Sequence, residues 1–297
     1  MTELFPSRSA GGSALRGLLD REGVLIAPGC FDALSARVLE AAGHDAIFCG
    51  GFSVAATRLG LPDVGLLSYG EMVDQVGGVS MASRLPVIAD ADTGYGNAMN
   101  AQRSVLGFAR AGAACVMIED QRWPKQCGHT IGKQVVERSE AVARVRAAVD
   151  VRDAHGLDVL IMARTDAAAA VSFDEALARA AVFADAGADL TFLEAPESTE
   201  QMERYCAEVP GHKVANLVED GRTPWLSPVE LSEIGFSLAL YPVSLLLHAG
   251  AAMQHAAEAL RGGASTEARM SFDGLRSSVG WDDYDATQAD YDTTEGA

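Results

Sequence analysis

The sequence predicts an α/β protein, most economically a (β/α)8 TIM-type barrel with an extra C-terminal helix. Two observations support this prediction: short apolar runs alternate with segments of helical periodicity, and eight such runs occur along the 297 residues. Each crossover helix returns the chain to the same edge of the sheet, so the strands are expected to pair in parallel. With eight repeats the sheet can close, and such barrels typically contain about 250 residues.

The expected strands are apolar runs bounded by glycine, proline or acidic residues. In chain order they are VLIAPG from Val24, AIFCGG from Ala46, PVIADAD from Pro86, CVMIED from Cys115, VLIMARTD from Val159, LTFLEAP from Leu190, KVANLVE from Lys213 and FSLALYPVS from Phe236. Intervening segments such as 97–113 and 172–189 carry apolar residues at spacings of three and four, which is typical of helices packed on one face.

An open, doubly wound sheet is the alternative arrangement of these elements. Its dinucleotide-binding form carries GxGxxG after the first strand, whereas PGCFD has a single glycine and TGYGNA lacks the third. The closed barrel is therefore preferred. Residues 1–262 are expected to form one barrel domain, and residues 263–297 an acidic and loose C-terminal tail.

Composition and charge exclude several classes of function. The net charge of -18 opposes binding to nucleic acid or to anionic membranes. No apolar run approaches the roughly 20 residues that span a bilayer. The five cysteines are odd in number and contain no CxxC pair, which argues against a disulfide framework and a structural zinc site. We therefore expect a cytoplasmic protein with no membrane or nucleic-acid partner.

Polar residues gather at the predicted C-terminal strand ends, where the active site of such a barrel lies. Asp90 and Asp92 are two residues apart on one strand, so their side chains point to the same face. Glu119 ends the next strand. Clustered oxygen ligands of this kind suit a hard divalent cation, with magnesium expected and manganese as an alternative. Further strand ends contribute Asp120, Arg164, Asp166, Glu194, Asn216 and Glu219.

The loop after the fourth strand holds a cysteine between two basic residues. Cys127 lies two residues from both Lys125 and His129. Nearby cations lower a thiol pKa, so Cys127 could exchange a proton near neutral pH. The alternatives are an incidental or buried cysteine and a zinc ligand, the latter disfavoured because no second cysteine is close.

Several motifs together resemble the isocitrate lyase and phosphoenolpyruvate mutase superfamily, over about residues 15–261. They are LGLPDVG with Asp63, ADADTGYGN, EDQ, PKQCGH, ARTDA, FLEAP and GRTPWLSPVELSEIGF, in this order. Within the superfamily the chain is most similar to the branch with methylisocitrate lyase, dimethylmalate lyase and carboxyphosphonoenolpyruvate mutase.

The resemblance implies a magnesium-dependent lyase that cleaves or forms a carbon–carbon bond in a small carboxylate, giving a pyruvate-type 2-oxo acid. It implies metal binding by Asp63, Asp90, Asp92 and Glu119. It implies catalytic roles for Cys127 as an acid or base on a mobile lid, for Arg164 as a carboxylate clamp, and for Glu194. The expected substrate-binding residues are Phe48, Gly50, Gly51, Asp90, Gly128, His129, Arg164 and Asn216. The family also implies a homotetramer in which the C-terminal helix is exchanged between subunits.

Two departures from the family pattern bear on the substrate. Gly50 stands where family lyases commonly have a serine, and Leu246 and Leu247 stand where methylisocitrate lyases usually have an arginine. A third carboxylate would lose its partner, so we expect a 2-hydroxy or 2-oxo dicarboxylate that resembles dimethylmalate more than methylisocitrate. The alternatives are an oxaloacetate or phosphonopyruvate hydrolase, a carboxyphosphonoenolpyruvate mutase-like enzyme, and a non-catalytic metabolite-binding barrel.

Overall fold

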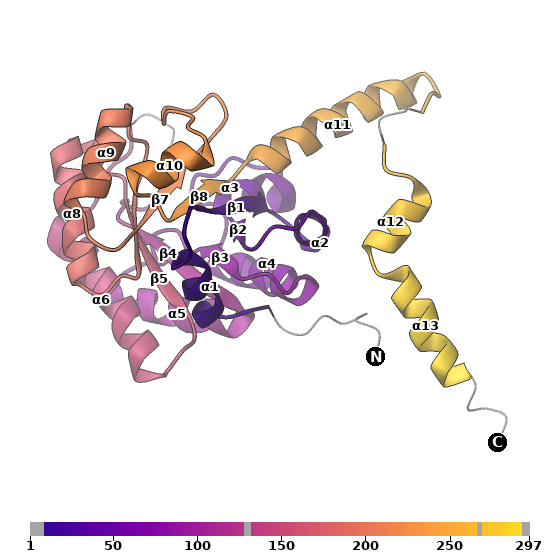
Figure 1. Ribbon diagram of the computed structural model, residues 1–297, viewed down its shortest axis with the longest axis horizontal. Helices are drawn as coiled ribbons and strands as arrows, with labels where there is room; N and C mark the ends of the chain where they lie inside the picture. Colours follow the sequence, from indigo (N-terminus) through magenta and orange to yellow (C-terminus); the bar gives the residue numbers. More distant parts are fainter. Residues whose placement is uncertain (1–8, 128–131, 266–268, 293–297) are drawn as a thin grey trace.

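The predicted barrel is confirmed in the computed structural model, which describes residues 9–127, 132–265 and 269–292. Eight parallel strands close in sequence order, from β1 next to β2 around to β8 next to β1 (Figure 1). The strands are β1 (Leu25–Cys30), β2 (Ile47–Cys49), β3 (Val87–Asp90), β4 (Ala113–Glu119), β5 (Leu160–Thr165), β6 (Leu190–Leu193), β7 (His212–Asn216) and β8 (Leu238–Tyr241).

Helices precede, connect and follow the strands, and those between consecutive strands cover the outside of the barrel. The helices are α1 (Gly12–Leu19), α2 (Ala33–Ala41), α3 (Gly51–Val54), the π-helix η1 (Ala55–Leu59), α4 (Tyr69–Ala82), α5 (Ala98–Ala111), α6 (Arg138–Ala154), α7 (Ala167–Ala170), α8 (Phe173–Asp185), α9 (Thr199–Glu208), α10 (Pro228–Ile234), α11 (Ser244–Arg261), α12 (Phe272–Ser278) and α13 (Trp281–Asp292). Helix α5 shows why the sequence forms them. The Asn97 side chain accepts hydrogen bonds from the first backbone amides, and Gly112 ends the helix in the left-handed conformation.

The core has two layers because neighbouring strand residues face opposite sides of the sheet. Ile88 and Met117 fill the inside of the barrel together with residues of the other strands. Their neighbours Val87 and Val116 face outward and pack against the helices. Leu15 of α1 belongs to the inner cluster and is fully buried, so α1 lies against the barrel interior. The polar residues at the C-terminal ends of the strands lie at the other end of the barrel from α1.

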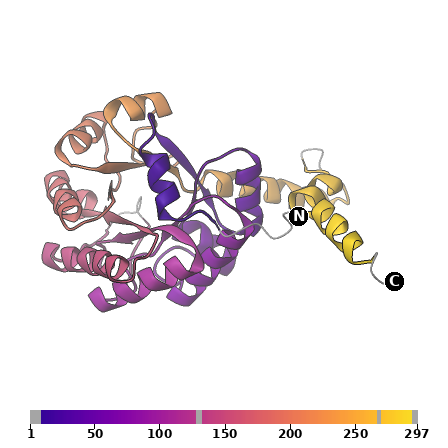
Figure 2. The ribbon, with the colours of Figure 1, turned by 60° about the horizontal axis from the view of Figure 1, so that its bottom comes forward.

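Helices α11 to α13 form an arm that leaves the barrel (Figures 1 and 2). No residue of α11 or α12 is buried within this chain. The expectation of a loose tail is wrong for the part of it that the structure describes, because Phe272–Ser278 and Trp281–Asp292 are helical. The arm touches the barrel domain where the Arg37 side chain of α2 donates a hydrogen bond to the Ser278 carbonyl at 3.5 Å. Among the described residues, no helix combines the length and apolar character needed to cross a membrane.

Candidate active site

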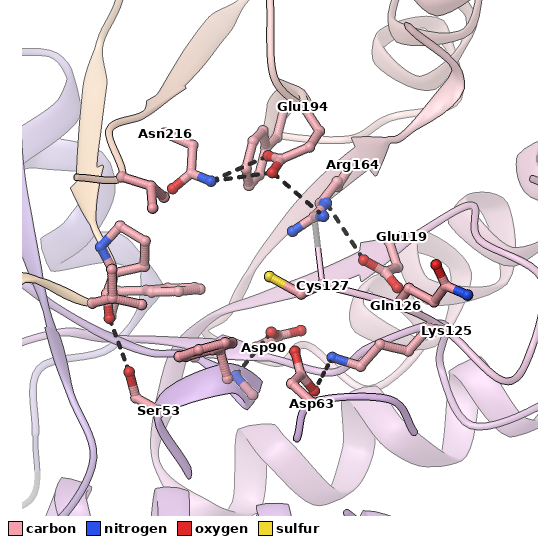
Figure 3. A pocket seen from close by; sticks show the side chains of 18 of the residues that line it. Ser53, Asp63, Asp90, Glu119, Lys125, Gln126, Cys127, Arg164, Glu194 and Asn216 are labelled. Carbon is pink, nitrogen blue, oxygen red and sulfur yellow. Dashed lines mark hydrogen bonds and ion pairs between the residues drawn. The ribbon is translucent and has the colours of Figure 1, made fainter. Parts of the chain in front are cut away.

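A pocket of about 880 Å³, including the part that opens to solvent, lies at the C-terminal ends of the strands. Strands β2 to β7 and the segment after β8 all contribute to its wall (Figure 3). Ten of the predicted site residues line it: Phe48, Gly50, Gly51, Asp63, Asp90, Glu119, Cys127, Arg164, Glu194 and Asn216. The structure therefore brings these predicted residues together around one pocket.

An acidic cluster with a lysine at its centre lies on one side of the pocket. The Nζ atom of Lys125 is 2.5 Å from Asp63 Oδ1 and 2.8 Å from Asp92 Oδ1. Asp90 accepts a hydrogen bond from the Gly51 amide at 3.0 Å and one from the Asp92 amide at 2.9 Å. Asp92 does not itself line the pocket but lies directly behind it, in contact with Lys125. All four charged side chains are buried.

Burial dominates the protonation of this cluster. It raises the pKa of Asp92 to about 7, partly opposed by the Lys125 charge and reinforced by Asp90 and Asp63. For Lys125, burial alone would lower the pKa, but the charges of Asp92, Asp90 and Asp63 outweigh it and raise the pKa well above its usual range. The acids therefore hold a positive charge among them.

Glu119 at the end of β4 is the second feature of the acidic side. Burial raises the pKa of Glu119 well above its usual range, although the Arg164 charge acts to lower it. Its Oε2 atom is 3.4 Å from Arg164 Nε. Its Oε1 atom is buried and makes no hydrogen bond to any residue in the described part of the chain. A buried carboxylate oxygen without a protein partner is costly, so this atom is suited to bind a cation or an ordered water.

The carboxylates fit a divalent cation as a donor set. Within the described segments, no three or more His, Cys, Asp or Glu side chains converge on one point as a metal centre. Magnesium, however, commonly binds through one or two carboxylates and keeps several waters. Asp90 and Glu119, which both line the pocket, meet that smaller requirement.

Arg164 is the cation of the opposite wall, and acidic partners hold its orientation. Asp166 accepts hydrogen bonds from Arg164 Nε at 2.8 Å and from Arg164 Nη2 at 3.0 Å. Arg164 Nη2 is also 3.7 Å from Glu194 Oε1. The Asn216 amide donates to both oxygens of Glu194 at 3.3 and 3.2 Å. Burial acts to lower the pKa of Arg164, but the charges of Asp166, Glu194 and Glu119 raise it well above its usual range, so the guanidinium stays charged.

The loop after β4 brings its cysteine to the pocket. Figure 3 shows the Cys127 side chain pointing into the pocket between Arg164 and Asp90. The Gln121 side chain holds this part of the loop by donating to the Gln126 carbonyl at 2.9 Å and accepting from the Gln126 amide at 3.0 Å. The predicted substrate-binding residues Gly128 and His129 lie outside the described residues.

Two glycines after β2 are explained by their surroundings. A Cβ atom on Gly50 would lie 2.6 Å from Cε1 of the Phe48 ring, so a serine there would require the ring to move. A Cβ on Gly51 would lie 3.2 Å from Asp90 Oδ2 and 3.3 Å from Lys125 Nζ. Gly51 therefore allows the backbone to approach the acidic cluster closely.

The sequence analysis missed three kinds of contribution. Lys125 was considered only as a neighbour of Cys127, whereas it is the internal counter-ion of Asp63 and Asp92. Lys133 was not recognised, although its Nζ atom is 2.6 Å from Asp166 Oδ1. The third is most of the apolar part of the wall, formed by Phe52, Phe192, Val218, Pro242 and Val243. Leu247 completes this wall and was the one member that the sequence analysis had named.

A closed parallel barrel with buried carboxylates, an arginine and a cysteine around one pocket defines an enzyme of the TIM-barrel class. Residues 15–261 match the phosphoenolpyruvate phosphomutase family. The 2,3-dimethylmalate lyase of Eubacterium barkeri is 44% identical over 239 residues, which cover 80% of this chain and 82% of that protein.

Solved structures agree with this assignment. An oxaloacetate acetylhydrolase in complex with the inhibitor 3,3-difluorooxalacetate has a TM-score of 0.91 at 32% identity, covering 98% of this chain and 100% of the other. A 2,3-dimethylmalate lyase described as a PEP mutase/isocitrate lyase superfamily member has a TM-score of 0.89 at 36% identity, covering 98% of each chain. The chain therefore belongs to the phosphoenolpyruvate mutase family and is an enzyme of the isocitrate lyase/phosphoenolpyruvate mutase superfamily. The resemblance found in the sequence is confirmed.

Proposed function

We propose that this enzyme is a magnesium-dependent lyase that cleaves, or in reverse forms, a carbon–carbon bond in an alkyl-substituted 2-hydroxy dicarboxylate. One product is a pyruvate-type 2-oxo acid. The observation that carries the proposal is the division of the pocket into an acidic side with Asp90 and Glu119, a single arginine at Arg164, and an apolar wall. The 2,3-dimethylmalate lyase relative supports the substrate class.

We propose that Asp90 and Glu119 hold the cation, with Asp63 and Asp92 next to them. A bound Mg²⁺ would supply electrostatic stabilisation of negative charge on the 2-oxygen of the substrate. Lys125 occupies the same acidic cluster, with its Nζ atom 2.5 Å from Asp63. It therefore lowers the repulsion among the acids, which are otherwise close enough to raise one another's pKa.

The chain's own residues divide the remaining work. Arg164 binds a substrate carboxylate, because its planar guanidinium matches two carboxylate oxygens better than an ammonium does. Glu194 and Asn216 hold the neighbouring wall through their mutual hydrogen bonds. In the cleavage the substrate hydroxyl gives its proton to a base such as a solvent water and its oxygen becomes the 2-oxo oxygen, while the electron pair of the broken carbon–carbon bond passes to the departing carbon. Cys127 then donates its thiol proton to that carbon.

The apolar wall argues for alkyl substituents on the substrate. Among the lining residues described by the structure, the side chains that carry a permanent positive charge are Lys125 and Arg164, and both lie against carboxylates. Leu247 and Val243 lie on the apolar part of the wall. A third carboxylate there would be desolvated next to apolar side chains, which is costly, whereas a methyl group would gain about 0.8 kcal/mol of burial.

The test is a product screen with matched metal conditions. The purified enzyme is incubated with 2,3-dimethylmalate, methylisocitrate or oxaloacetate, with Mg²⁺ or with EDTA, and 2-oxo acids and oxalate are quantified. We expect Mg²⁺-dependent release of a 2-oxo acid, fastest from dimethylmalate. Oxalate formation from oxaloacetate as the dominant reaction would favour the hydrolase alternative, which the oxaloacetate acetylhydrolase structure makes a specific candidate. No turnover of any substrate with Mg²⁺ would favour a non-catalytic barrel.

We also infer a cytoplasmic homotetramer in which the arm of α11 to α13 is exchanged between subunits. The arm exposes large apolar side chains, including Met253 at 62%, Leu260 at 68% and Phe272 at 73%. Exposed apolar surface of this extent marks an interaction site. Light scattering should give the mass of four chains, and a monomeric mass would contradict the inference. The five cysteines, all within the described residues, are not joined in disulfides, which is consistent with a reducing compartment.

A further inference from the structure

Asp166 lies between two cations at the end of β5. Its Oδ1 atom is 2.6 Å from Lys133 Nζ and 3.0 Å from Arg164 Nη2, and its Oδ2 atom is 2.8 Å from Arg164 Nε. The side chains of Lys133 and Asp166 are 1% and 0% exposed, so water contributes little to this group. Burial acts to raise the pKa of Asp166, but Arg164 and Lys133 lower it to about 2, so it is ionised at neutral pH.

The contact with Asp166 fixes which edge of Arg164 faces the pocket. A guanidinium has five N–H donors, and Asp166 uses the Nε donor and one Nη2 donor. The remaining donors are two on Nη1 and one on Nη2, and these form the edge available to a substrate carboxylate. Since Arg164 lines the pocket whereas Asp166 and Lys133 do not, these two residues act behind the clamp.

The charges explain why a second cation is needed there. Arg164 lies within 4 Å of three acidic side chains, Asp166, Glu119 and Glu194. If all three were ionised, their combined negative charge would exceed the single positive charge of Arg164. Lys133 shares the charge of Asp166 through a shorter contact, at 2.6 Å, than either contact of Arg164. Arg164 therefore keeps more of its positive charge for an incoming anion.

Lys133 also belongs to the stem of the loop that carries Cys127. An antiparallel bridge pairs Gln121 with Val135, and the Val136 amide donates to the Asp120 carbonyl at 2.9 Å. Two buried arginines hold the stem from outside: Arg144 donates to the Gln121 carbonyl at 3.2 Å, and Arg179 donates to the Val136 carbonyl at 2.9 Å. The position of Lys133 is therefore fixed by the fold and not only by its partner.

We propose that Lys133 is a positioning residue that acts through Asp166 to orient Arg164 and to preserve its charge for the substrate carboxylate. The inference rests on the proposed function, in which Arg164 is the carboxylate clamp. It predicts that Lys133 affects the binding of the carboxylate ligand more strongly than the binding of the metal. Of the two proposed metal ligands, Glu119 is 3.4 Å from Arg164, whereas Asp90 lies in the cluster around Lys125 on the other side of the pocket.

The experiment measures two affinities separately in the full-length protein. The first is the Kd of oxalate in the presence of saturating Mg²⁺, by calorimetry, and the second is the Kd of Mn²⁺ alone, by electron paramagnetic resonance. The variants are Lys133→Met, Lys133→Arg, Asp166→Asn and the double variant K133M/D166N. Lys213→Met, at the start of β7 and the far end of the barrel, is the matched control.

We expect Lys133→Met to weaken oxalate binding by roughly tenfold and Lys133→Arg to restore it to within about threefold of the wild type. Lys213→Met should equal the wild type in both measurements, and the Lys133 variants should bind Mn²⁺ within about threefold of the wild-type affinity. Because Lys133 acts through Asp166, adding Lys133→Met to the Asp166→Asn protein should change oxalate binding by less than about threefold. This comparison also covers the case in which Lys133→Met alone does not fold, since the double variant loses both charges of the buried pair.

Three results would overturn the proposal. One is wild-type oxalate affinity in Lys133→Met, and another is a parallel loss of Mn²⁺ affinity, which would indicate general disruption of the site. The third is a full, additive effect of Lys133→Met in the Asp166→Asn background. If the wild-type protein itself binds no oxalate with Mg²⁺, the proposed function fails first and this inference fails with it.

Discussion

Replacing Leu247 with arginine should shift the enzyme from dicarboxylate to tricarboxylate substrates. Leu247 is at the start of α11, lines the apolar part of the pocket wall and is 49% exposed. Its neighbour Leu246 does not line the pocket. In the sequence the two leucines were equivalent candidates for the position of the missing arginine, and the structure distinguishes between them.

The size of the shift follows from two terms. A new cation 4 Å from a carboxylate gains about 4 kcal/mol at an effective dielectric constant of about 20. Half-exposure at the pocket mouth reduces this gain to about 1–2 kcal/mol, or roughly 5- to 30-fold in kcat/KM. Loss of apolar contact with one methyl group costs about 0.8 kcal/mol, or roughly fourfold, for an alkyl substrate. The ratio of kcat/KM for methylisocitrate to that for 2,3-dimethylmalate should therefore rise roughly 20- to 100-fold.

The assay compares both substrates under identical Mg²⁺ in wild type, Leu247→Arg and Leu246→Arg. The Leu246 variant adds the same charge one residue away and should leave the ratio close to that of the wild type. The gain in Leu247→Arg should also shrink at high ionic strength, because part of it comes from a solvent-exposed charge. An unchanged ratio in Leu247→Arg, or an equal shift in Leu246→Arg, would refute the assignment of this wall to the alkyl group.

Three further predictions concern other parts of the chain. Cys127→Ser should lower kcat by at least about a hundredfold while the Kd of Mn²⁺ stays the same. Cys206→Ser, at a cysteine that does not line the pocket, should keep the wild-type kcat. Equal turnover in Cys127→Ser would show that Cys127 is not the proton donor. Phe183, 1% exposed, packs between β5 and the helices, so Phe183→Ala should lower the free energy of unfolding in urea by about 3–5 kcal/mol, whereas Met81→Ala, at a position 72% exposed, should stay within about 0.5 kcal/mol. The pKa of Asp166 is lowered from 3.8 to about 2 in the folded protein, so its ionised form stabilises the fold above about pH 4. About 2 kcal/mol of that stability is lost as the pH falls to about 2. Urea titrations across this pH range should show a shallower pH dependence of the unfolding free energy in Asp166→Asn, and an identical slope would contradict the lowered pKa.

The barrel could be predicted from the sequence because both of its periodicities are local. The run VIAD of β3 alternates inward and outward residues, and the segment of α5 carries its cap at Asn97 and its stop at Gly112. The expected strands were too long at their C-terminal ends. The run that begins at Pro86 was expected to reach Asp92, whereas β3 ends at Asp90. Asp92, two residues after the end of β3, adopts a left-handed backbone with φ of 48° that does not fit a strand.

The residues that line the pocket could be predicted where a motif keeps chemically meaningful residues together, as for Asp90 at the end of β3 or Cys127 in its loop. It was not predictable where partners are distant in the sequence. Lys133 and Asp166 are 33 residues apart, and nothing in the sequence pairs them. Most of the apolar wall was missed for a similar reason, because it combines single residues from β6, α11 and the loops between.

Lys125 bears on how the proposed metal site would be loaded. The three buried aspartates Asp63, Asp90 and Asp92 would repel one another without a nearby positive charge, but the Lys125 ammonium contacts Asp63 and Asp92. The polypeptide can thus reach its native form first and load the ion afterwards. If the proposed Mg²⁺ dependence holds, a chelator should abolish activity but leave the protein folded, and added Mg²⁺ should restore the activity.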